Sequence, residues 1–284
     1  MIWVVAPTYN ERENIGVLIE KIFALRIPEL KMMVVDDNSP DGTAEVAEEF
    51  SKKYPVSVIR RSKKLGLGTA YAEAFQEILD GSEASKLVNG FDAASGHGSA
   101  EGGERASITP SEPRRGERGK RNGLLASQAS DIIIQIDADL SHDPAVIPAF
   151  LEKIKNCDLV LGSRYIAEGK IVNWDKTRQL ISKFGNAYAR TVLGLPYADL
   201  TGGFKCWRAD LLRRIDLASL SSVGYNFQIE TTHQAHQLDA KIIEHPIIFT
   251  ERKFGISKFN FPIMLEAFWK VLLLKLESHQ NAKN

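Results

Sequence analysis

The sequence contains few cysteines and has no net charge, and each of these absences argues against a class of protein. Its 284 residues include only two cysteines, Cys157 and Cys206, too few for a disulfide framework and without metal-ligand spacing. Its 36 basic and 36 acidic residues cancel, which argues against a nucleic-acid binder that works by bulk electrostatics. We therefore expect two buried cysteines and no nucleic-acid partner.

Long apolar runs are missing as well. No 18 consecutive residues are apolar, and the nearest candidate, 261–276, is interrupted by Glu266, Lys270 and Lys275. The N-terminus carries neither the basic segment nor the long apolar segment of a secretory signal. We expect a cytoplasmic protein without a transmembrane helix that is able to touch a membrane surface.

Apolar runs alternate with amphipathic stretches through the first half. Short apolar runs predict strands at Ile2–Ala6, Met32–Val35, Val56–Ile59, Ile132–Ile136 and Leu159–Leu161. The predicted helices between them run from Asn10, as an N-cap, to about Arg26, from Thr43 (capped by Asp41) to Tyr54, from Ala70 to Leu79, and from Pro144 to about Lys155. This alternation predicts an α/β fold with a mainly parallel, Rossmann-like sheet flanked by helices.

The segment 81–123 interrupts this pattern. It holds nine of the 21 glycines and a single aromatic residue, Phe91, so it cannot bury enough apolar surface to offset its chain entropy. We predict a disordered insertion within a single domain that spans 1–284. The less regular second half predicts helices at Lys176–Leu193 and Phe227–Leu238, a loop at Asp199–Phe204, an edge strand at Ile242–Phe249 and a C-terminal amphipathic helix at 261–277.

Two aspartates, Asp137 and Asp139, follow the fourth predicted strand as Asp-Ala-Asp. Residues i and i+2 of a strand point to the same side, and two carboxylates held close together repel unless a cation lies beside them. Mg²⁺ or Mn²⁺ suits such oxygen ligands, with diphosphate oxygens completing its shell. The motif alone is common, and one aspartate could instead cap the next helix; the apolar strand before it and Leu-Ser-His-Asp-Pro after it favour the metal site.

Polar residues also follow the first two predicted strands. Tyr9 offers a flat ring for a nucleobase, and Glu11 could accept hydrogen bonds from a base or ribose. Asp37, in Val-Val-Asp-Asp, fits a carboxylate that binds a ribose hydroxyl. No glycine-rich dinucleotide fingerprint or Walker sequence is present.

Basic residues complete the candidate site. Arg164 ends the fifth predicted strand, Arg178 begins a predicted helix, and Arg252 and Lys258 lie in a loop rich in small residues. Phosphates need cationic donors, and arginine binds phosphate oxygens in a fork. Each residue alone is an ordinary surface charge, but together they predict a site for diphosphate and lipid phosphate.

Five segments together resemble a known family. They are Pro-Thr-Tyr-Asn-Glu-Arg-Glu-Asn at 7–14, Val-Asp-Asp-Asn-Ser-Pro-Asp-Gly-Thr at 35–43, Asp-Ala-Asp-Leu-Ser-His-Asp-Pro at 137–144, Gly-Ser-Arg-Tyr at 162–165 and Gly-Ile-Ser-Lys at 255–258. The chain resembles the family 2 glycosyltransferases of GT-A (nucleotide-diphospho-sugar transferase) fold. Within them it is similar to the catalytic subunits of the dolichol-phosphate (polyprenol-phosphate) mannose synthases.

The resemblance implies a role for each matching residue. Pro7, Tyr9, Glu11, Val35 and Asp37 would line a guanosine pocket. Asp137 and Asp139 would bind the metal and diphosphate, with the Ala138 backbone near the donor sugar. Arg164 and Arg252 would hold phosphates, Lys258 would assist at donor or acceptor, and Arg178 is a further candidate; Asp139, Arg164 and Arg252 are the predicted catalytic residues. Ser141 stands where some relatives have a glutamine near the metal.

The resemblance also implies a reaction. Mannose would pass from GDP-mannose to dolichyl or polyprenyl phosphate with inversion, giving a β-linked product. A lipid phosphate is ionised at neutral pH and needs no strong base. The enzyme would be peripheral on the cytoplasmic face of a membrane (the endoplasmic reticulum in a eukaryote), with small membrane-embedded subunits as partners.

Three alternatives remain open from the sequence. The donor could be UDP-glucose, which would make the chain a polyprenyl-phosphate glucosyltransferase. A nucleotidyltransferase also uses metal-bound aspartates on a parallel sheet, but it usually has a glycine-rich basic loop after the first strand, where this chain has Pro7–Glu11. A non-catalytic binding subunit would not need the aspartate pair. The apolar face of 261–277 could lie on a bilayer or on a partner's helix.

Overall fold

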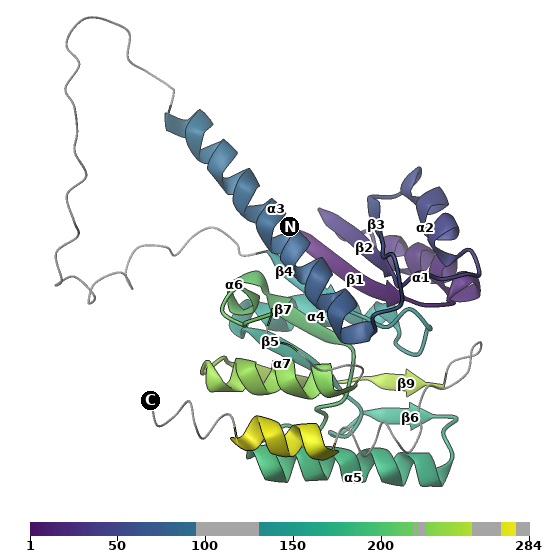
Figure 1. The fold of residues 1–284 in the computed structure, drawn as a ribbon, viewed down its shortest axis with the longest axis vertical. Helices are drawn as coiled ribbons and strands as arrows, with labels where there is room; N and C mark the ends of the chain where they lie inside the picture. The colour runs from purple at the N-terminus through teal and green to yellow at the C-terminus, as the bar shows by residue number, and fades with distance from the viewer. Residues whose placement is uncertain (95–130, 219, 221–224, 252–267, 277–284) are drawn as a thin grey trace, which may run out of the picture.

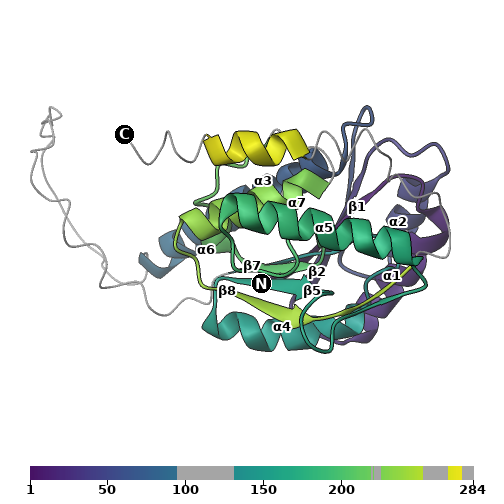
Figure 2. The same cartoon turned by 90° about the horizontal axis from the view of Figure 1, so that it is seen from below.

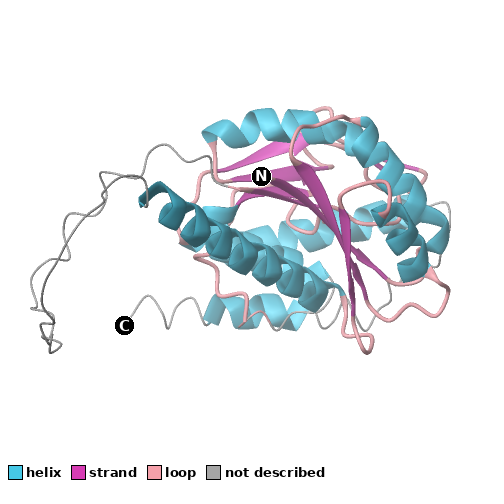
Figure 3. Ribbon diagram, turned by 90° about the horizontal axis from the view of Figure 1, so that it is seen from above, coloured by secondary structure: helices cyan, strands magenta, loops and turns pink. Residues whose placement is uncertain are grey.

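A computed structural model describes residues 1–94, 131–218, 220, 225–251 and 268–276. Its centre is a seven-stranded sheet in the order β3-β2-β1-β4-β7-β5-β8, and helices cover both faces of this sheet (Figures 1 and 3). The strands of this sheet are β1 (Ile2–Thr8), β2 (Leu30–Asp36), β3 (Val56–Arg60), β4 (Ile132–Gln135), β5 (Leu159–Ser163), β7 (Lys205–Arg208) and β8 (Ile242–Pro246). The short strands β6 (Lys170–Val172) and β9 (Ile248–Thr250) form a separate two-stranded sheet.

Helices alternate with most of the strands along the chain. The α-helices are α1 (Arg12–Ala24), α2 (Thr43–Ser51), α3 (Leu67–Ala94), α4 (Ile147–Lys153), α5 (Lys176–Leu193), α6 (Ala209–Leu212) and α7 (Tyr225–Gln237). Two 3₁₀ turns, Pro144–Val146 and Ile154–Asn156, flank α4. The predicted α/β class with a mainly parallel sheet is confirmed.

The register of the sheet brings several strand ends to one edge. β1 runs parallel to both β2 and β4, with Thr8 opposite Asp36 and Val5 opposite Gln135. β7 is antiparallel to both β4 and β5, so β4 and β5 run in the same direction. The carboxyl ends of β1, β2, β4 and β5 therefore share an edge with the loop that enters β7, and ligands of open α/β sheets bind at such an edge.

Alternate residues of the central strands pack into two cores, one on each face. Val5 and Ile133 face a core with Tyr71, Phe75 and Trp207, while Val4 and Ile134 face a second core. Both cysteines are buried and free, as predicted. Because β1 and β4 are buried on both faces, the loops that follow them are held on a rigid support.

Several predicted boundaries differ from the structure. The predicted strand Ile242–Phe249 is divided in two, and its first part is the edge strand β8. The short strand β7 was not predicted, because four residues carry too little periodicity to mark it. Asn10 does not cap α1: its φ of 60° is left-handed and the helix begins at Arg12. Asp41 does accept the backbone N–H of Thr43, at 3.0 Å.

Two predicted segments are only partly described. α3 continues past Leu79 to Ala94, so the first part of the segment 81–123 is helical, whereas 95–123 lies outside the described residues. Residues 268–276 of the predicted C-terminal helix are helical, with 261–267 and 277 outside the description. Within the described ranges, every helix is too short or too polar to cross a bilayer.

Candidate active site

Asp137 and Asp139 lie in the loop after β4 and line one pocket of about 40 Å³. Ala138 between them is buried, and Leu140 after them adopts a left-handed φ of 61°, which turns the chain toward Ser141. The pocket brings together residues from five separate parts of the chain. It is lined by Asp137, Asp139, His142, Arg164, Trp174, Arg178, Thr201, Gly203 and Phe249.

The two carboxylates are held differently. Oδ1 of Asp139 accepts hydrogen bonds from the backbone N–H and the hydroxyl of Ser141, at 3.1 and 2.5 Å. Asp137 lies against the backbone of Gly203, where a Cβ atom would come within 2.8 Å of both carboxylate oxygens. Glycine at 203 therefore lets the loop before β7 approach the acid pair.

Two further groups pack around Asp137. The buried His142 has Nε2 3.3 Å from Oδ2 of Asp137, yet neither ring nitrogen makes a hydrogen bond of good geometry with a described residue. Its ring packs against Phe204 and Phe249, which are the contacts of a structural residue. Burial, and then the charge of Asp137, raise the pKa of Tyr71 well above its usual range, so Tyr71 stays protonated.

The acid pair fits a hard divalent cation that takes part of its shell from a ligand. Carboxylate oxygens are the ligands that Mg²⁺ and Mn²⁺ prefer. Among the described residues there is no group of three or more histidine, cysteine, aspartate or glutamate side chains able to hold a metal by themselves. Asp137 and Asp139 therefore suit an ion that is bound together with the oxygens of a diphosphate.

Arg164, at the end of β5, reaches this pocket as half of a buried ion pair. Its Nε and Nη2 donate to the two carboxylate oxygens of Asp199, both at 2.7 Å, and Nη2 also donates to Thr201 at 2.8 Å. Burial would raise the pKa of Asp199, but the charge and hydrogen bonds of Arg164 outweigh it and hold that pKa below its ordinary value. The bidentate contact with Asp199 therefore holds the Arg164 guanidinium in place at the pocket.

Arg178 comes to the same pocket from the first turn of α5. Its guanidinium lies 4.0 Å from the centre of the Trp174 ring, and Nη1 donates to Glu251 at 2.7 Å. The other two predicted phosphate-binding residues, Arg252 and Lys258, lie outside the described residues. Of the predicted cations, the structure therefore brings Arg164 and Arg178 to the acid pair.

Asp37 directly follows β2, at the same edge of the sheet, and is also buried. Its carboxylate accepts hydrogen bonds from Nη1 of Arg61 and from the backbone N–H groups of Leu65 and Gly66, at 2.7–2.9 Å. Asp36 beside it bonds to Thr8 and Ser39 and shapes the turn. Asp37 thus anchors the loop that leads into α3 at the edge where a nucleotide was predicted.

The remaining predicted nucleotide contacts line the ends of β1 and β2. Pro7 and Val35 are register partners on these strands and are buried. Tyr9 is half-buried, and the ammonium of Lys64 lies 3.6 Å from its ring centre. Glu11 accepts a hydrogen bond from Asn14 at 2.7 Å and thereby supports the start of α1.

Sequence reasoning missed Arg61, Trp174 and Asp199. Arg61 and Asp199 are distant in sequence from Asp37 and Arg164, the residues that they contact, so strand-end position could not indicate them. Trp174 lies four residues before Arg178 but follows no predicted strand. Asp199 lay within a predicted loop, and the Gly202-Gly203 pair in that loop was the one available signal of a close backbone approach.

Comparison with known proteins gives three findings. The model of the family described as "Glycosyl transferase family 2" matches residues 3–80 and 92–216. The chain is 36% identical over 264 residues to an undecaprenyl-phosphate mannosyltransferase of Micrococcus luteus, covering 93% of this chain and 89% of that protein. It is 34% identical over 271 residues to a polyprenol monophosphomannose synthase of Mycolicibacterium smegmatis, covering 94% and 84%.

Solved structures show the same fold at lower identity. The crystal structure of glucosyl-3-phosphoglycerate synthase from M. tuberculosis matches with a TM-score of 0.56 at 17% identity, covering 98% of this chain and 80% of that one. The same enzyme in complex with Mn²⁺, UDP-glucose and phosphoglyceric acid also matches with a TM-score of 0.56, at 18% identity and with 97% and 79% covered. The predicted GT-A fold is confirmed.

Proposed function

The chain belongs to glycosyl transferase family 2, and from that premise we propose that it transfers mannose from GDP-mannose to a polyprenyl phosphate, dolichyl phosphate included, with inversion. Both curated relatives, each at least 34% identical over most of this chain, bear names that specify mannosyl transfer to a polyprenyl phosphate. The observation that carries the proposal is the pocket in which two carboxylates face two arginines.

The acceptor explains why the site holds cations rather than an obvious base. A phosphate monoester is already largely deprotonated at neutral pH, so its oxygen can attack the anomeric carbon directly. A carbon–oxygen bond forms there while the bond to the leaving diphosphate breaks on the opposite face, and both electrons leave with GDP. No proton has to move, and inversion makes the product a β-linked mannosyl phosphate.

The residues of the pocket have distinct proposed tasks. Asp137 and Asp139 would hold Mg²⁺ or Mn²⁺, which neutralises charge on the leaving diphosphate when bound. Arg164 and Arg178 would bring the acceptor phosphate and the donor diphosphate together in spite of their like charges. His142 would keep Asp137 oriented as a positioning residue.

The base of the donor would lie at the ends of β1 and β2. Tyr9 would stack on it, Pro7 and Val35 would line its apolar side, and Glu11 and Asp37 would serve as hydrogen-bond acceptors. In the structure the ammonium of Lys64 lies over one face of the Tyr9 ring, so a base that stacks on that same face has to displace this lysine. Arg252, Lys258 and Ala138 remain proposed contacts of the donor. The protein would act as a peripheral enzyme at the cytoplasmic face of a membrane, with small membrane-embedded subunits as partners.

A product analysis with two donors tests the proposal. The full chain is given radiolabelled GDP-mannose or UDP-glucose with a polyprenyl phosphate, and label in the lipid phase is measured with and without a chelator. We expect mannose to enter the lipid phase only when a divalent metal is present, and NMR to show a β-linkage. Labelling from UDP-glucose alone would establish the glucosyltransferase alternative, and an α-linked product would overturn inversion.

A further inference from the structure

Two neighbouring helices carry charge of one sign. α5 contains four cationic residues and no acidic residue, and residues 268–276 contain two lysines and no acidic residue. The whole chain has as many acidic as basic residues. These two helices therefore present cations without acidic side chains of their own, which favours an anionic partner.

The same helices expose large apolar side chains. Leu180 and Phe184, one turn apart on α5, are each 69% exposed. Trp269, Leu273 and Leu276, spaced i, i+4 and i+7, are 59%, 54% and 61% exposed. These spacings place each set on one stripe of its helix.

Contacts between the two helices make their stripes parts of one face. The ring of Tyr188 on α5 stacks on Phe268 with centres 4.3 Å apart, and its hydroxyl donates to the Phe268 carbonyl at 3.0 Å. Val271 is buried on the domain side. Both views of the fold show the helices side by side on one side of the molecule (Figures 1 and 2). We call Leu180, Phe184, Trp269, Leu273 and Leu276 the apolar platform.

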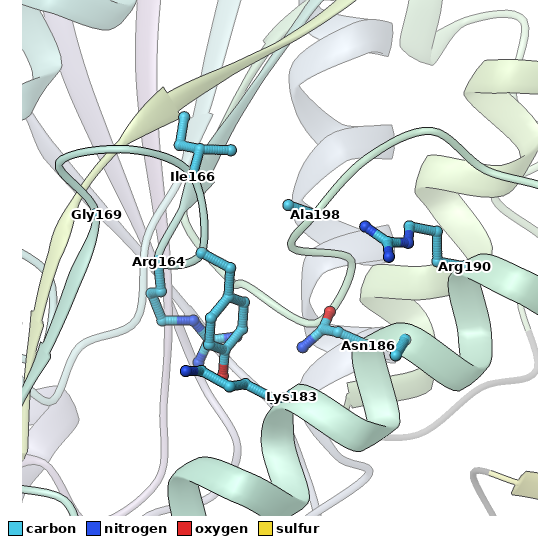
Figure 4. Close-up of a pocket in the computed structure, with 9 residues that line it drawn as sticks. Arg164, Ile166, Gly169, Lys183, Asn186, Arg190 and Ala198 are labelled. Atoms are coloured by element: carbon cyan, nitrogen blue, oxygen red, sulfur yellow. The ribbon is translucent and has the colours of Figure 1, made fainter.

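A basic pocket of about 370 Å³ opens beside the platform, between α5 and the loop after β5. Lys183, Asn186 and Arg190 project into it from α5, as Figure 4 shows. Lys183 and Arg190 are exposed and form no ion pair with a described residue. None of the residues that line the pocket is acidic: they are Arg164, Tyr165, Ile166, Gly169, Lys183, Asn186, Ala187, Arg190 and Ala198.

We propose that this face docks on an anionic lipid bilayer, with the apolar platform in the interface and the phosphate of a phospholipid headgroup in the Lys183–Arg190 pocket. An amphipathic surface with cations at its border and a tryptophan among its apolar groups is typical of interfacial binding. Charge complementarity selects the bilayer over a neutral apolar partner.

The position of α5 connects this face to the chemistry. Arg178 in its first turn lines the pocket of the acid pair, and Leu180 is exposed two residues further on. A lipid phosphate in the docked bilayer would thus approach the site along α5 while its hydrocarbon chain stays in the membrane. This last step rests on the proposed function; the docking itself does not.

Vesicle binding tests the docking directly. The full chain is sedimented with phosphatidylcholine vesicles, with and without phosphatidylglycerol, at low and high salt. We expect binding to the anionic vesicles that weakens with salt, and a loss of about tenfold or more in the double variant Lys183→Glu/Arg190→Glu. The variant Leu180→Ser/Phe184→Ser should weaken binding at both salt concentrations, because it removes apolar insertion.

Matched variants on α1 serve as controls. Lys21→Glu and Val17→Ser change an exposed cation and an exposed apolar residue away from this face, and they should bind vesicles as the wild type does. Thermal melts check that every variant is folded. Equal binding by all variants, or absence of wild-type binding to anionic vesicles, would overturn the proposal.

Two other outcomes would also contradict it and are distinguishable. A dimer in solution that Leu180→Ser/Phe184→Ser disperses would assign the platform to a second copy of the chain. Binding only when a membrane-embedded subunit is present would assign it to a protein partner. Sedimentation needs no donor, so a failure of mannosyl transfer leaves the vesicle result standing, and transfer to a short-chain polyprenyl phosphate in solution would persist if docking fails.

Discussion

Two buried arginine–aspartate pairs flank the Asp137–Asp139 motif at the carboxyl edge of the sheet, and they are built differently. In the Asp37–Arg61 pair, next to β2, the carboxylate also accepts two backbone N–H groups and Glu73 lies 3.0 Å from Nε of the arginine. In the Arg164–Asp199 pair, next to β5, one carboxylate takes both forks of the guanidinium and the arginine faces three aromatic rings.

The different contacts of the two pairs hold different parts of the candidate site in place. The first pair ties a loop to the sheet and spreads its charge over several partners, so it builds a wall of the proposed nucleotide pocket. The second pair is centred on a bidentate contact between one guanidinium and one carboxylate, which the Thr201 hydroxyl and the backbone N–H of Arg164 support, and it holds one arginine at the acid pair. In the first pair Arg61 lies near two carboxylates, those of Asp37 and Glu73, so the loss of one leaves a second charge beside it.

The largest effect is expected between the two pairs, at Asp139. Asp139→Asn keeps an oxygen that can accept both hydrogen bonds from Ser141, so the fold should persist, but it removes a charge that the proposed metal needs. We expect mannosyl transfer to fall about a thousandfold or more, measured with labelled donor.

Asp143→Asn is the matched control for that change. Asp143 caps the turn at Pro144 through the backbone N–H of Ala145, and asparagine is an equally good cap. It should retain activity. Unchanged transfer in Asp139→Asn would contradict a catalytic role for the acid pair and support a binding subunit.

A direct test of the comparison removes one aspartate from each pair. Asp199→Asn removes the carboxylate that pairs with the buried Arg164 guanidinium, and we expect a loss of about 3–5 kcal/mol in unfolding free energy. Asp37→Asn should cost less, about 1–3 kcal/mol, because Glu73 and the retained amide oxygen still serve Arg61 and the loop. Urea unfolding of both variants measures the difference, and equal losses would show that the number of partners does not matter here.

A smaller effect on activity is expected at Gly203, whose backbone lies against Asp137 of the acid pair. In Gly203→Ala the new Cβ would lie 2.8 Å from the Asp137 oxygens, so the carboxylate has to move. We expect kcat to fall by about tenfold with little change in thermal stability. Gly185→Ala, in α5, is the control: apart from its chain neighbours and the backbone of its own helix, no atom lies within 4 Å of the new Cβ, and the variant should keep full activity.

The last prediction concerns a gradual effect of pH, which is small for each step in pH and arises at Lys205, a residue that is buried in β7. Burial lowers its pKa from 10.5 to about 7, while the unfolded chain keeps the ordinary value. Between these values the unfolded state binds more protons, so stability should rise with pH above about 7, by at most about 1.4 kcal/mol per pH unit. Lys205→Met should flatten this part of the profile, as urea unfolding at several pH values would reveal; an equal slope in both proteins would refute the assignment.

Much of the fold was predictable because a buried strand requires a continuous run of apolar residues, which is visible in the sequence. The apolar runs of β1, β2 and β4 are hydrophobic on both faces, and the polar residues directly after them mark the carboxyl edge. Strand β7 and the division between β8 and β9 could not be predicted, because they depend on which distant strand is available for pairing.

The candidate site, like the fold, was predictable only in part. Asp137, Asp139, Arg164 and Arg178 were proposed from local sequence, and the structure gathers them around one pocket. The acids that pair with the two arginines, Asp199 and Glu251, are 35 and 73 residues away in sequence, so no local pattern could connect them. Arg252 and Lys258 remain predictions.

By itself the sequence determined the class of fold, the edge at which the chemistry lies and the acid pair, because strand periodicity and strand-end position are local properties of the chain. Only the tertiary structure decided which charges face the pocket and which neutralise one another behind it. It also decided that α5 and the last described helix present one cationic, apolar face. Pairing and exposure depend on neighbours that the folded chain brings together from distant segments, and no local stretch of residues encodes them.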